Sequence, residues 1–161
     1  MTQLLTLCMV CKDDQVLLGY KKRGFGAGRW NGFGGKLIEG ETLEAAAKRE
    51  LYEEVGIIPE EMPKLGIISF SFDGDSKKLE VHIFRIDAFS GEPTESEEMD
   101  PKWFTASEIP FTQMWSDDEY WFPYLLANKK FTASFHFDKP STAEYSSKIL
   151  NMQINEVDTL P

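Results

Sequence analysis

The sequence predicts an α+β domain, organised as an α/β/α sandwich with a mixed central sheet. Its 161 residues fit a single domain, 1–161, that is large enough to bury a core without disulfide or metal staples. Apolar runs rich in β-branched and aromatic side chains recur along the chain, and two other segments carry helix signals. Because strand-like runs precede and follow these helices, we expect the sheet to be flanked by helices.

Four of the apolar runs pair into two candidate hairpins. Residues 4–10 and 15–19 are separated by the polar segment 12–14, which favours a hairpin or a tight connection. Residues 65–72 and 79–89 flank a turn predicted at 73–78. A further strand is expected at 131–137, where aromatic and small side chains alternate with polar ones. The tail 138–161 is polar, and no element is assigned to it.

The clearest helix covers residues 42–55. Leu43, Ala47, Leu51 and Val55 recur every four positions and form one apolar face, and Gly56 supplies a stop signal. A second helix is expected to begin at residues 117–118 and to run to about residue 128, with Pro123 as an internal irregularity.

Charge and cysteine content restrict the class of protein. The net charge is −10, so a basic stripe for a nucleic-acid polymer is not expected, although metal ions and a few lysines allow a small polyanionic substrate. Cys8 and Cys11 fall on opposite faces of the first strand, which disfavours a mutual disulfide and favours buried, reduced thiols. The first apolar run is too short to span a membrane. We therefore expect a cytoplasmic protein without a membrane partner, with nuclear or mitochondrial pools left open.

A glycine-rich loop precedes the first helix. Six glycines fall within residues 24–35, and this density indicates unusual backbone angles or a ligand that approaches the main chain closely. Asn31 lies in this loop and offers a donor and an acceptor to the edge of a purine, although asparagine is also a common turn residue.

Three glutamates share one face of the first helix. Glu50, Glu53 and Glu54 stand at helical spacing i, i+3 and i+4. Taken as charge alone, such a face is more often simply solvated. Clustered carboxylate oxygens also suit Mg²⁺ or Mn²⁺, and the residues around them decide between the two interpretations.

Those surrounding residues complete a specific pattern. It reads Gly35-x5-Glu41-x7-Arg49-Glu50-Leu51-x-Glu53-Glu54-x-Gly56-Ile57, and every fixed position is occupied. This pattern is the Nudix box, and the chain resembles the Nudix hydrolases, which cleave nucleoside diphosphates linked to another moiety with the help of divalent cations. The resemblance implies the Nudix fold, with the box helix carrying the metal ligands.

The resemblance also implies roles for individual residues. The metal ions, Mg²⁺ or in its place Mn²⁺, would be held by Glu50, Glu53, Glu54, the Gly34 carbonyl and a distal glutamate, for which Glu98 is the candidate and Glu97 a close rival. Arg49 would orient the Glu53 carboxylate. Water would attack the β-phosphorus, with either Glu53 or Glu98 as the base.

The base-binding residues lie outside the box. Aromatic faces stack on purine rings, and several aromatic side chains could line a flat pocket. The adjacent pair Asp117 and Asp118 is either a helix N-cap or, if both side chains enter one apolar site, a pair in which one carboxyl keeps a proton near neutral pH. Such a pair offers a donor and an acceptor, and moving the proton lets it accept different purine tautomers.

Two segments, residues 21–36 and 115–123, are similar to a branch of the Nudix family that acts on oxidised purine nucleoside triphosphates. The similarity implies hydrolysis of 8-oxo-dGTP, 2-hydroxy-dATP and ribonucleotide or methylated analogues to monophosphate and pyrophosphate, which would sanitise the nucleotide pool. It implies a substrate site made of Thr6, Leu7, Lys21, Phe25, Asn31, Phe33, Gly34, Gly35, Lys36, Phe70, Phe72, Met99, Trp115, Ser116, Asp117, Asp118 and Trp121. Leu79 stands where a longer apolar residue is expected at the pocket edge.

Two alternatives remain at this point. One is a Nudix enzyme for another nucleotide, against which Asn31 and the Asp117–Asp118 pair argue. The other is a non-catalytic Nudix-fold binding module, which would be expected to have lost part of the glutamate set. We expect a monomeric enzyme with a small nucleotide substrate.

Overall fold

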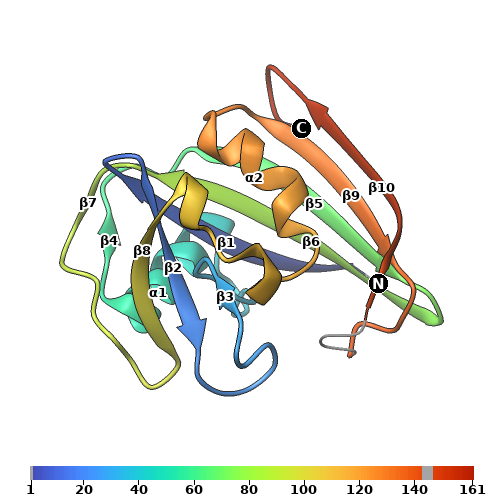
Figure 1. Ribbon diagram of the computed structural model, residues 1–161, viewed down its shortest axis with the longest axis horizontal. Coiled ribbons are helices and arrows are strands. Elements are labelled where there is room, and N and C mark those ends of the chain that lie inside the picture. Colours follow the sequence, from blue (N-terminus) through green and yellow to red (C-terminus); the bar gives the residue numbers. More distant parts are fainter. Residues whose placement is uncertain (1, 143–146) are drawn as a thin grey trace.

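The computed structural model describes residues 2–142 and 147–161, and its strands form one large mixed sheet (Figure 1). The sheet order is β10-β9-β5-β6-β1-β2-β3, and β8 also pairs with β2. The main strands are β1 (Thr2–Lys12), β2 (Gln15–Lys21), β5 (Lys64–Phe72), β6 (Asp75–Ile86), β8 (Met99–Thr105), β9 (Phe131–Phe137) and β10 (Ile149–Glu156). Shorter strands are β3 (Trp30–Asn31), β4 (Ile58–Pro59) and β7 (Phe89–Ser90), of which the last two pair with each other.

The strand directions are mixed, as the sequence predicts. β1 runs parallel to β6 and β5 runs parallel to β9, whereas the remaining pairs of the large sheet are antiparallel. β1 and β2 form the expected hairpin, and Asp13 and Asp14 make its two-residue turn with φ angles of 51° and 62°. The second hairpin turns at Asp73 and Gly74, so β6 begins at Asp75, before the predicted residue 79.

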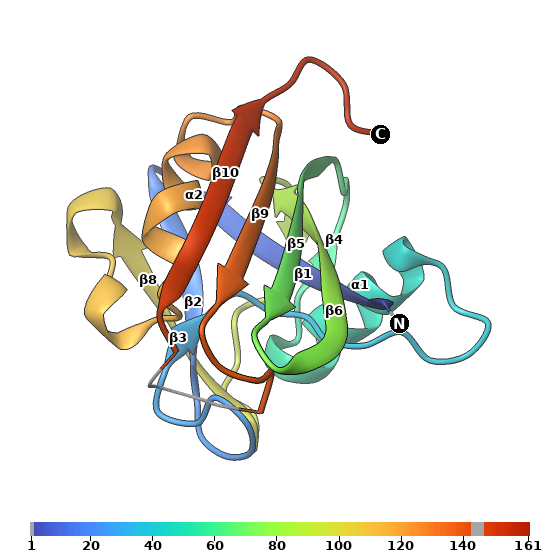
Figure 2. The same cartoon turned by 90° about the vertical axis from the view of Figure 1, so that its right-hand side faces the viewer.

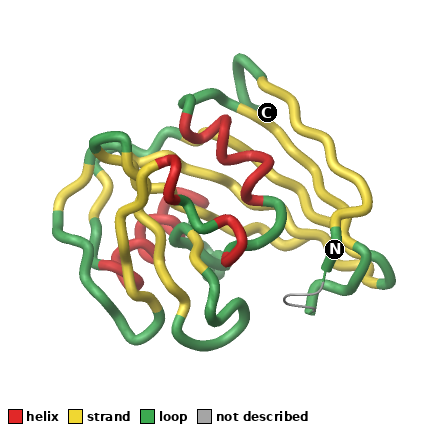
Figure 3. The backbone as a smooth tube through the Cα atoms, viewed as in Figure 1, coloured by secondary structure: helices red, strands yellow, loops and turns green. Residues whose placement is uncertain are grey.

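One helix covers each face of the sheet, which confirms the sandwich (Figures 2 and 3). α1 (Leu43–Val55) packs with Cys8, Leu17 and Phe84 on one face, and α2 (Asp118–Leu126) packs with Cys11 and Phe131 on the other. The two buried, free cysteines of β1 therefore belong to different cores, in keeping with their predicted opposite orientation.

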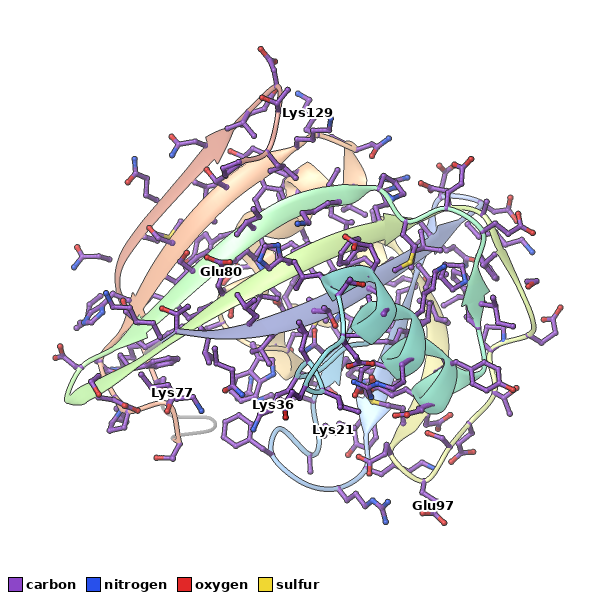
Figure 4. All side chains as sticks on the ribbon, turned by 180° about the vertical axis from the view of Figure 1, so that it is seen from behind. Lys21, Lys36, Lys77, Glu80, Glu97 and Lys129 are labelled. Atoms are coloured by element: carbon purple, nitrogen blue, oxygen red, sulfur yellow. The ribbon has the colours of Figure 1, made fainter. Side chains whose placement is uncertain are left out.

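Helix α1 is capped at both ends, and its end at Gly56 is the predicted one. The Thr42 hydroxyl accepts a hydrogen bond from the Ala45 backbone N–H at 3.1 Å, and Gly56 ends the helix with a left-handed φ of 74°. Ala47, Leu51 and Val55 are buried beneath the helix, so the opposite face is left for the glutamates. In Figure 4 this helix lies in front of the sheet.

The tail contains a strand that the polar composition did not indicate. β10 pairs antiparallel with β9 over its length and extends the sheet at one edge. Residues 143–146 of the predicted tail lie outside the described residues. Two 3₁₀ turns, η1 (Ala106–Glu108) and η2 (Phe111–Gln113), connect β8 to the segment before α2. Among the described residues, no helix has the length and apolar character needed to cross a membrane.

Candidate active site

A cavity of about 580 Å³ runs from the glycine-rich loop to the start of α2. Strands β1, β5 and β6, the loop 24–36 and the segment 115–121 supply its walls. Of the residues predicted to bind substrate or metal, it brings together Thr6, Leu7, Lys21, Phe25, Asn31, Gly34, Gly35, Lys36, Glu54, Phe70, Met99, Trp115, Asp117, Asp118 and Trp121.

Helix α1 meets the glycine-rich loop at one end of this cavity. The Gly34 backbone N–H donates to Glu54 Oε1 at 3.0 Å, and a Cβ on Gly34 would collide with the Thr6 carbonyl. A Cβ on Gly35 would lie 2.9 Å from the Glu50 carboxyl carbon. Both glycines are therefore needed for the loop to approach β1 and the two carboxylates closely.

Arg49 connects the carboxylates of the Nudix box. Its guanidinium donates to Glu41 at 2.7 and 3.0 Å and to Glu50 Oε1 at 2.7 Å, whereas the distance to Glu53 Oε2 is 3.4 Å. The bidentate partner is thus Glu41, and Arg49 orients Glu50 more directly than the predicted Glu53. These acidic partners raise the pKa of Arg49, and Arg49 in turn lowers the pKa of Glu41.

The other predicted carboxylates are more open to solvent. The Glu53 side chain is 57% exposed on α1. Glu98 accepts a 3.0 Å hydrogen bond from Arg23 Nε, and Glu97 pairs with the same guanidinium at 3.3 Å. Within residues 2–142 and 147–161, no three acidic, histidine or cysteine side chains converge into a ready-made metal cluster. Of the predicted ligands, Gly34 and Glu54 line the cavity, and each of the four predicted carboxylates accepts a hydrogen bond from a protein donor.

Burial sets the charge state of Glu54. Its pKa is raised to about 8, first by desolvation and then by the nearby charge of Glu50, with a smaller contribution from Glu98. A divalent cation would relieve this repulsion, and carboxylate and carbonyl oxygens are its preferred ligands. The residues present at this corner therefore fit a hard divalent metal ion.

The other end of the cavity is apolar and aromatic. A smaller chamber of about 220 Å³ shares its walls with the larger cavity and adds Phe72, Ser116 and Phe137 to them. Phe25 stacks on Trp115 with ring centroids 5.4 Å apart, and Phe70 stacks on Phe137 at 5.9 Å. Flat walls of this kind suit a planar heterocycle.

The Asp117–Asp118 pair lies at this aromatic end and does not act as a helix cap. Asp117 makes no capping hydrogen bond and instead accepts one from Trp121 Nε1 at 2.9 Å. Asp118 is 3% exposed, and its Oδ2 has no hydrogen-bond partner among the described residues. Burial raises the pKa of both carboxyls, and the charge of Asp117 raises that of Asp118 further, which favours one shared proton on the pair.

Phe33 and Asn31, both predicted to bind substrate, lie in different environments. Phe33 is fully buried in the core with α1 and lines neither cavity, so its predicted place in the pocket wall is corrected to a place in the core. The cause is the isolated bridge between Cys8 and Phe33, which turns the ring to the α1 face of the sheet. Asn31 stays in the larger cavity, and its Oδ1 accepts the Gly32 backbone N–H at 2.8 Å.

Several cavity residues were missed from the sequence. Arg29 lies with its guanidinium 5.0 Å from the Trp115 ring, and its charge acts on Asp118. Val81 could have been predicted from the alternation of side chains along β6, because it lies on the same face as Leu79. Both residues line both chambers. No comparable pattern marks Ser141 and Ser147, because they lie in the connection between β9 and β10.

Comparisons with known proteins agree with this geometry. The family model for the NUDIX domain matches residues 1–125. This chain belongs to the Nudix family. The family resemblance and the Nudix hydrolase class predicted from the box are thereby confirmed. Members of the family generally use divalent metal ions.

Two curated relatives and one solved structure are informative about this Nudix chain. The oxidized purine nucleoside triphosphate hydrolase of mouse (Mus musculus) is 52% identical over 98% of this chain and 97% of its own length. The zebrafish (Danio rerio) protein of the same name is 54% identical over 84% and 87%. A crystal structure of a mutator MutT protein from Bacillus halodurans matches with a TM-score of 0.81 and 28% identity, and covers 95% of this chain and 97% of that one.

Proposed function

We propose that this Nudix hydrolase cleaves oxidised purine nucleoside triphosphates, with 8-oxo-dGTP and 2-hydroxy-dATP as main substrates, to nucleoside monophosphate and pyrophosphate. The observation that carries the proposal is the buried Asp117–Asp118 pair inside an aromatic cavity that continues to the Glu54 and Gly34 corner. The names of the mouse and zebrafish relatives support the same substrate class. Removal of these nucleotides would keep them from being incorporated into DNA.

The acidic pair explains how one pocket takes two oxidised bases. A protonated Asp118 donates a hydrogen bond while an ionised Asp117, held by Trp121, accepts one. Transfer of the proton between the two carboxyls exchanges donor and acceptor, so the pair can match different purine tautomers. Asn31 would add polar contacts from the glycine-rich loop, and the stacked Phe25–Trp115 pair would cover one face of the base.

The phosphate end is assigned to the α1 corner. Glu50, Glu53, Glu54, Glu98 and the Gly34 carbonyl would hold Mg²⁺, which supplies charge neutralisation on the phosphoryl oxygens and activation of water. Arg49 fixes the direction of the Glu50 carboxylate.

Two protein groups complete the proposed phosphate end. Lys21 and Lys36 line the cavity and oppose the overall charge of −10 near the triphosphate.

The general base is proposed to be Glu53 rather than Glu98. The contact of Glu53 with Arg49 is 3.4 Å long, whereas Glu98 is held more closely by Arg23, at 3.0 Å. Attack at the β-phosphorus would then release pyrophosphate.

The proposal also covers the unit that performs the reaction. It takes residues 1–161 as one Nudix domain, acting as a monomer on a free nucleotide rather than on a nucleic-acid polymer. The cytoplasm is its proposed compartment, since Cys8 and Cys11 are free and buried thiols. Copies of the protein in the nucleus or in mitochondria would act on the nucleotide pools of those compartments.

The test is hydrolysis of 8-oxo-dGTP, 2-hydroxy-dATP and dGTP with and without Mg²⁺, with phosphate and pyrophosphate resolved as products. We expect Mg²⁺-dependent pyrophosphate release and a strong preference for the two oxidised purines. Hydrolysis without that preference would keep the metal helix and refute the role of Asp117 and Asp118. If none of these three nucleotides is hydrolysed, a wider panel of nucleoside diphosphate derivatives is tested. If none of that panel is hydrolysed either, a non-catalytic binding module is favoured.

A further inference from the structure

Ser141 and Ser147, which lie between β9 and β10, reach the base end of the cavity. Ser141 lies in both chambers and Ser147 in the smaller one, although both residues belong to the tail that follows the last predicted strand. This connection is closed at its base by Asp138, whose N–H donates to the Lys148 carbonyl at 2.9 Å and whose Oδ1 accepts the Lys148 N–H at 2.7 Å. The wall of the pocket is thus completed by a segment remote from the Nudix box.

A single carboxylate holds Ser141 in that wall. Asp75 Oδ2 accepts hydrogen bonds from the Ser141 hydroxyl at 2.7 Å and from its backbone N–H at 3.1 Å. Asp75 Oδ1 accepts the Lys77 backbone N–H at 2.9 Å, which fixes the carboxylate to the start of β6. These hydrogen bonds, that of the Ser141 hydroxyl first, lower the pKa of Asp75, so the acceptor is ionised at neutral pH.

We propose that Ser141 is a substrate-binding wall residue of the base pocket and that Asp75 is the positioning residue that holds it there. The inference rests on the proposed function and extends it to a part of the chain outside the Nudix box. Without the carboxylate, the Ser141 end of the connection loses both anchors and the pocket becomes wider at that side. A wider pocket holds the base less firmly but leaves the metal corner unchanged, so KM changes and kcat does not.

The same turn offers a control that is matched for charge. Asp73 precedes Asp75 by two residues, and its carboxylate accepts from His136 Nε2 at 3.0 Å rather than from a cavity residue. His136 Nδ1 in turn hydrogen-bonds the Ser71 hydroxyl at 2.7 Å. Asp73→Ala removes the same negative charge from the same hairpin tip as Asp75→Ala. Loss of a negative charge near the cavity would favour a polyanionic substrate, which is the opposite of the expected change. Lys77, at this end of the hairpin, is labelled in Figure 4.

The experiment measures kcat and KM for 8-oxo-dGTP in the wild-type protein, Asp75→Ala, Ser141→Ala, their double variant and Asp73→Ala. We expect Asp75→Ala to raise KM about three- to ten-fold with kcat within two-fold, and Ser141→Ala, which keeps its backbone donor, to raise KM about two- to three-fold. The double variant should be no worse than Asp75→Ala, because both changes remove one shared contact. Asp73→Ala should stay within two-fold, and the melting temperature of every variant is recorded.

Three results would overturn the inference: an unchanged KM in Asp75→Ala, an equal rise in Asp73→Ala, or a fall in kcat with KM unchanged. Binding of 8-oxo-dGMP, measured by calorimetry, separates this inference from the proposed function. If the wild-type protein binds the monophosphate without hydrolysing the triphosphate, the proposed function fails, and weaker binding by Asp75→Ala still supports the pocket wall. If the wild-type protein does neither, both fail.

Discussion

The two carboxylate groups of the cavity have opposite surroundings. Glu50 and Glu54 on α1 each accept a hydrogen bond from a fixed protein donor, Arg49 and the Gly34 N–H, and lie beside an exposed Glu53. Asp117 and Asp118 are buried among aromatic rings, and Trp121 is the partner of the first. The helix group suits a metal ion and charged phosphates, whereas the buried pair suits one shared proton and a neutral heterocycle. The chemistry of the same functional group, a carboxyl, is thus set by where the fold places it.

The strongest way to break this comparison is Glu54→Gln. We expect kcat to fall by about 100-fold or more, because the variant loses a proposed metal ligand in a site that has few of them. The change is nearly isosteric, and the amide oxygen of glutamine can still accept the Gly34 N–H, so the fold and the melting temperature should be kept. Near-full activity in a rapid phosphate-release assay would show that the metal assignment is wrong.

A pair of asparagine substitutions tests the base end. In Asp117→Asn the one remaining oxygen is needed by Trp121 Nε1, so an NH2 donor replaces the proposed acceptor toward the base, and kcat/KM for 8-oxo-dGTP should fall by about 10- to 100-fold. Asp118→Asn keeps a donor in the place of the proposed protonated carboxyl and should cost less than about 10-fold. Steady-state kinetics of both variants on the same substrate decide the assignment. A larger loss in Asp118→Asn would reverse the donor and acceptor roles.

Arg49→Lys tests whether Arg49 orients the carboxylates of α1. Lysine keeps the charge but cannot donate in two directions to Glu41 and Glu50 as the guanidinium does. We expect kcat to fall by about 10-fold with KM nearly unchanged, because the carboxylates lose their orientation. Glu41→Gln, which weakens the same contact from the other side, should give a similar fall, and normal kcat in both would remove the orienting role.

The smallest expected effect is on stability as a function of pH. Burial raises the pKa of Asp117 and Asp118 in the folded protein, so the folded state binds more protons than the unfolded state above the ordinary aspartate range. The free energy of unfolding should therefore fall as the pH rises from the ordinary aspartate pKa of 3.8 toward neutrality. Urea denaturation at several pH values, compared with the double variant Asp117→Asn/Asp118→Asn, should show a weaker fall in the variant. Equal slopes would mean that the pair is not buried in solution.

The sequence predicts the elements whose signals are local. The apolar face of α1 and its stop at Gly56 can be predicted from local sequence, and so can the β1–β2 hairpin and the alternating strand β9. β10 could not be read in this way, because its exposed residues carry no alternation and its stability comes from pairing with β9.

In the site, too, residues with local sequence signals were predicted, whereas those positioned by tertiary contacts were not. The Nudix box predicts the proposed metal corner, since its residues are close together in the sequence and Glu50, Glu53 and Glu54 lie on one helix. Phe33 was misplaced because the bridge to Cys8, a tertiary contact, decides which face of the sheet the ring enters. Ser141 was missed because tertiary hydrogen bonds to Asp75, which no local pattern marks, hold it at the pocket.

The most direct test measures kcat and KM of the wild-type protein, Glu54→Gln and Asp117→Asn on both 8-oxo-dGTP and dGTP with Mg²⁺. We expect Glu54→Gln to lose kcat on both nucleotides, whereas Asp117→Asn loses most of the preference for 8-oxo-dGTP and retains its slower rate on dGTP. If Asp117→Asn slowed both nucleotides equally, or if Glu54→Gln changed the preference and not the rate, the division of labour between the two carboxylate groups would be contradicted.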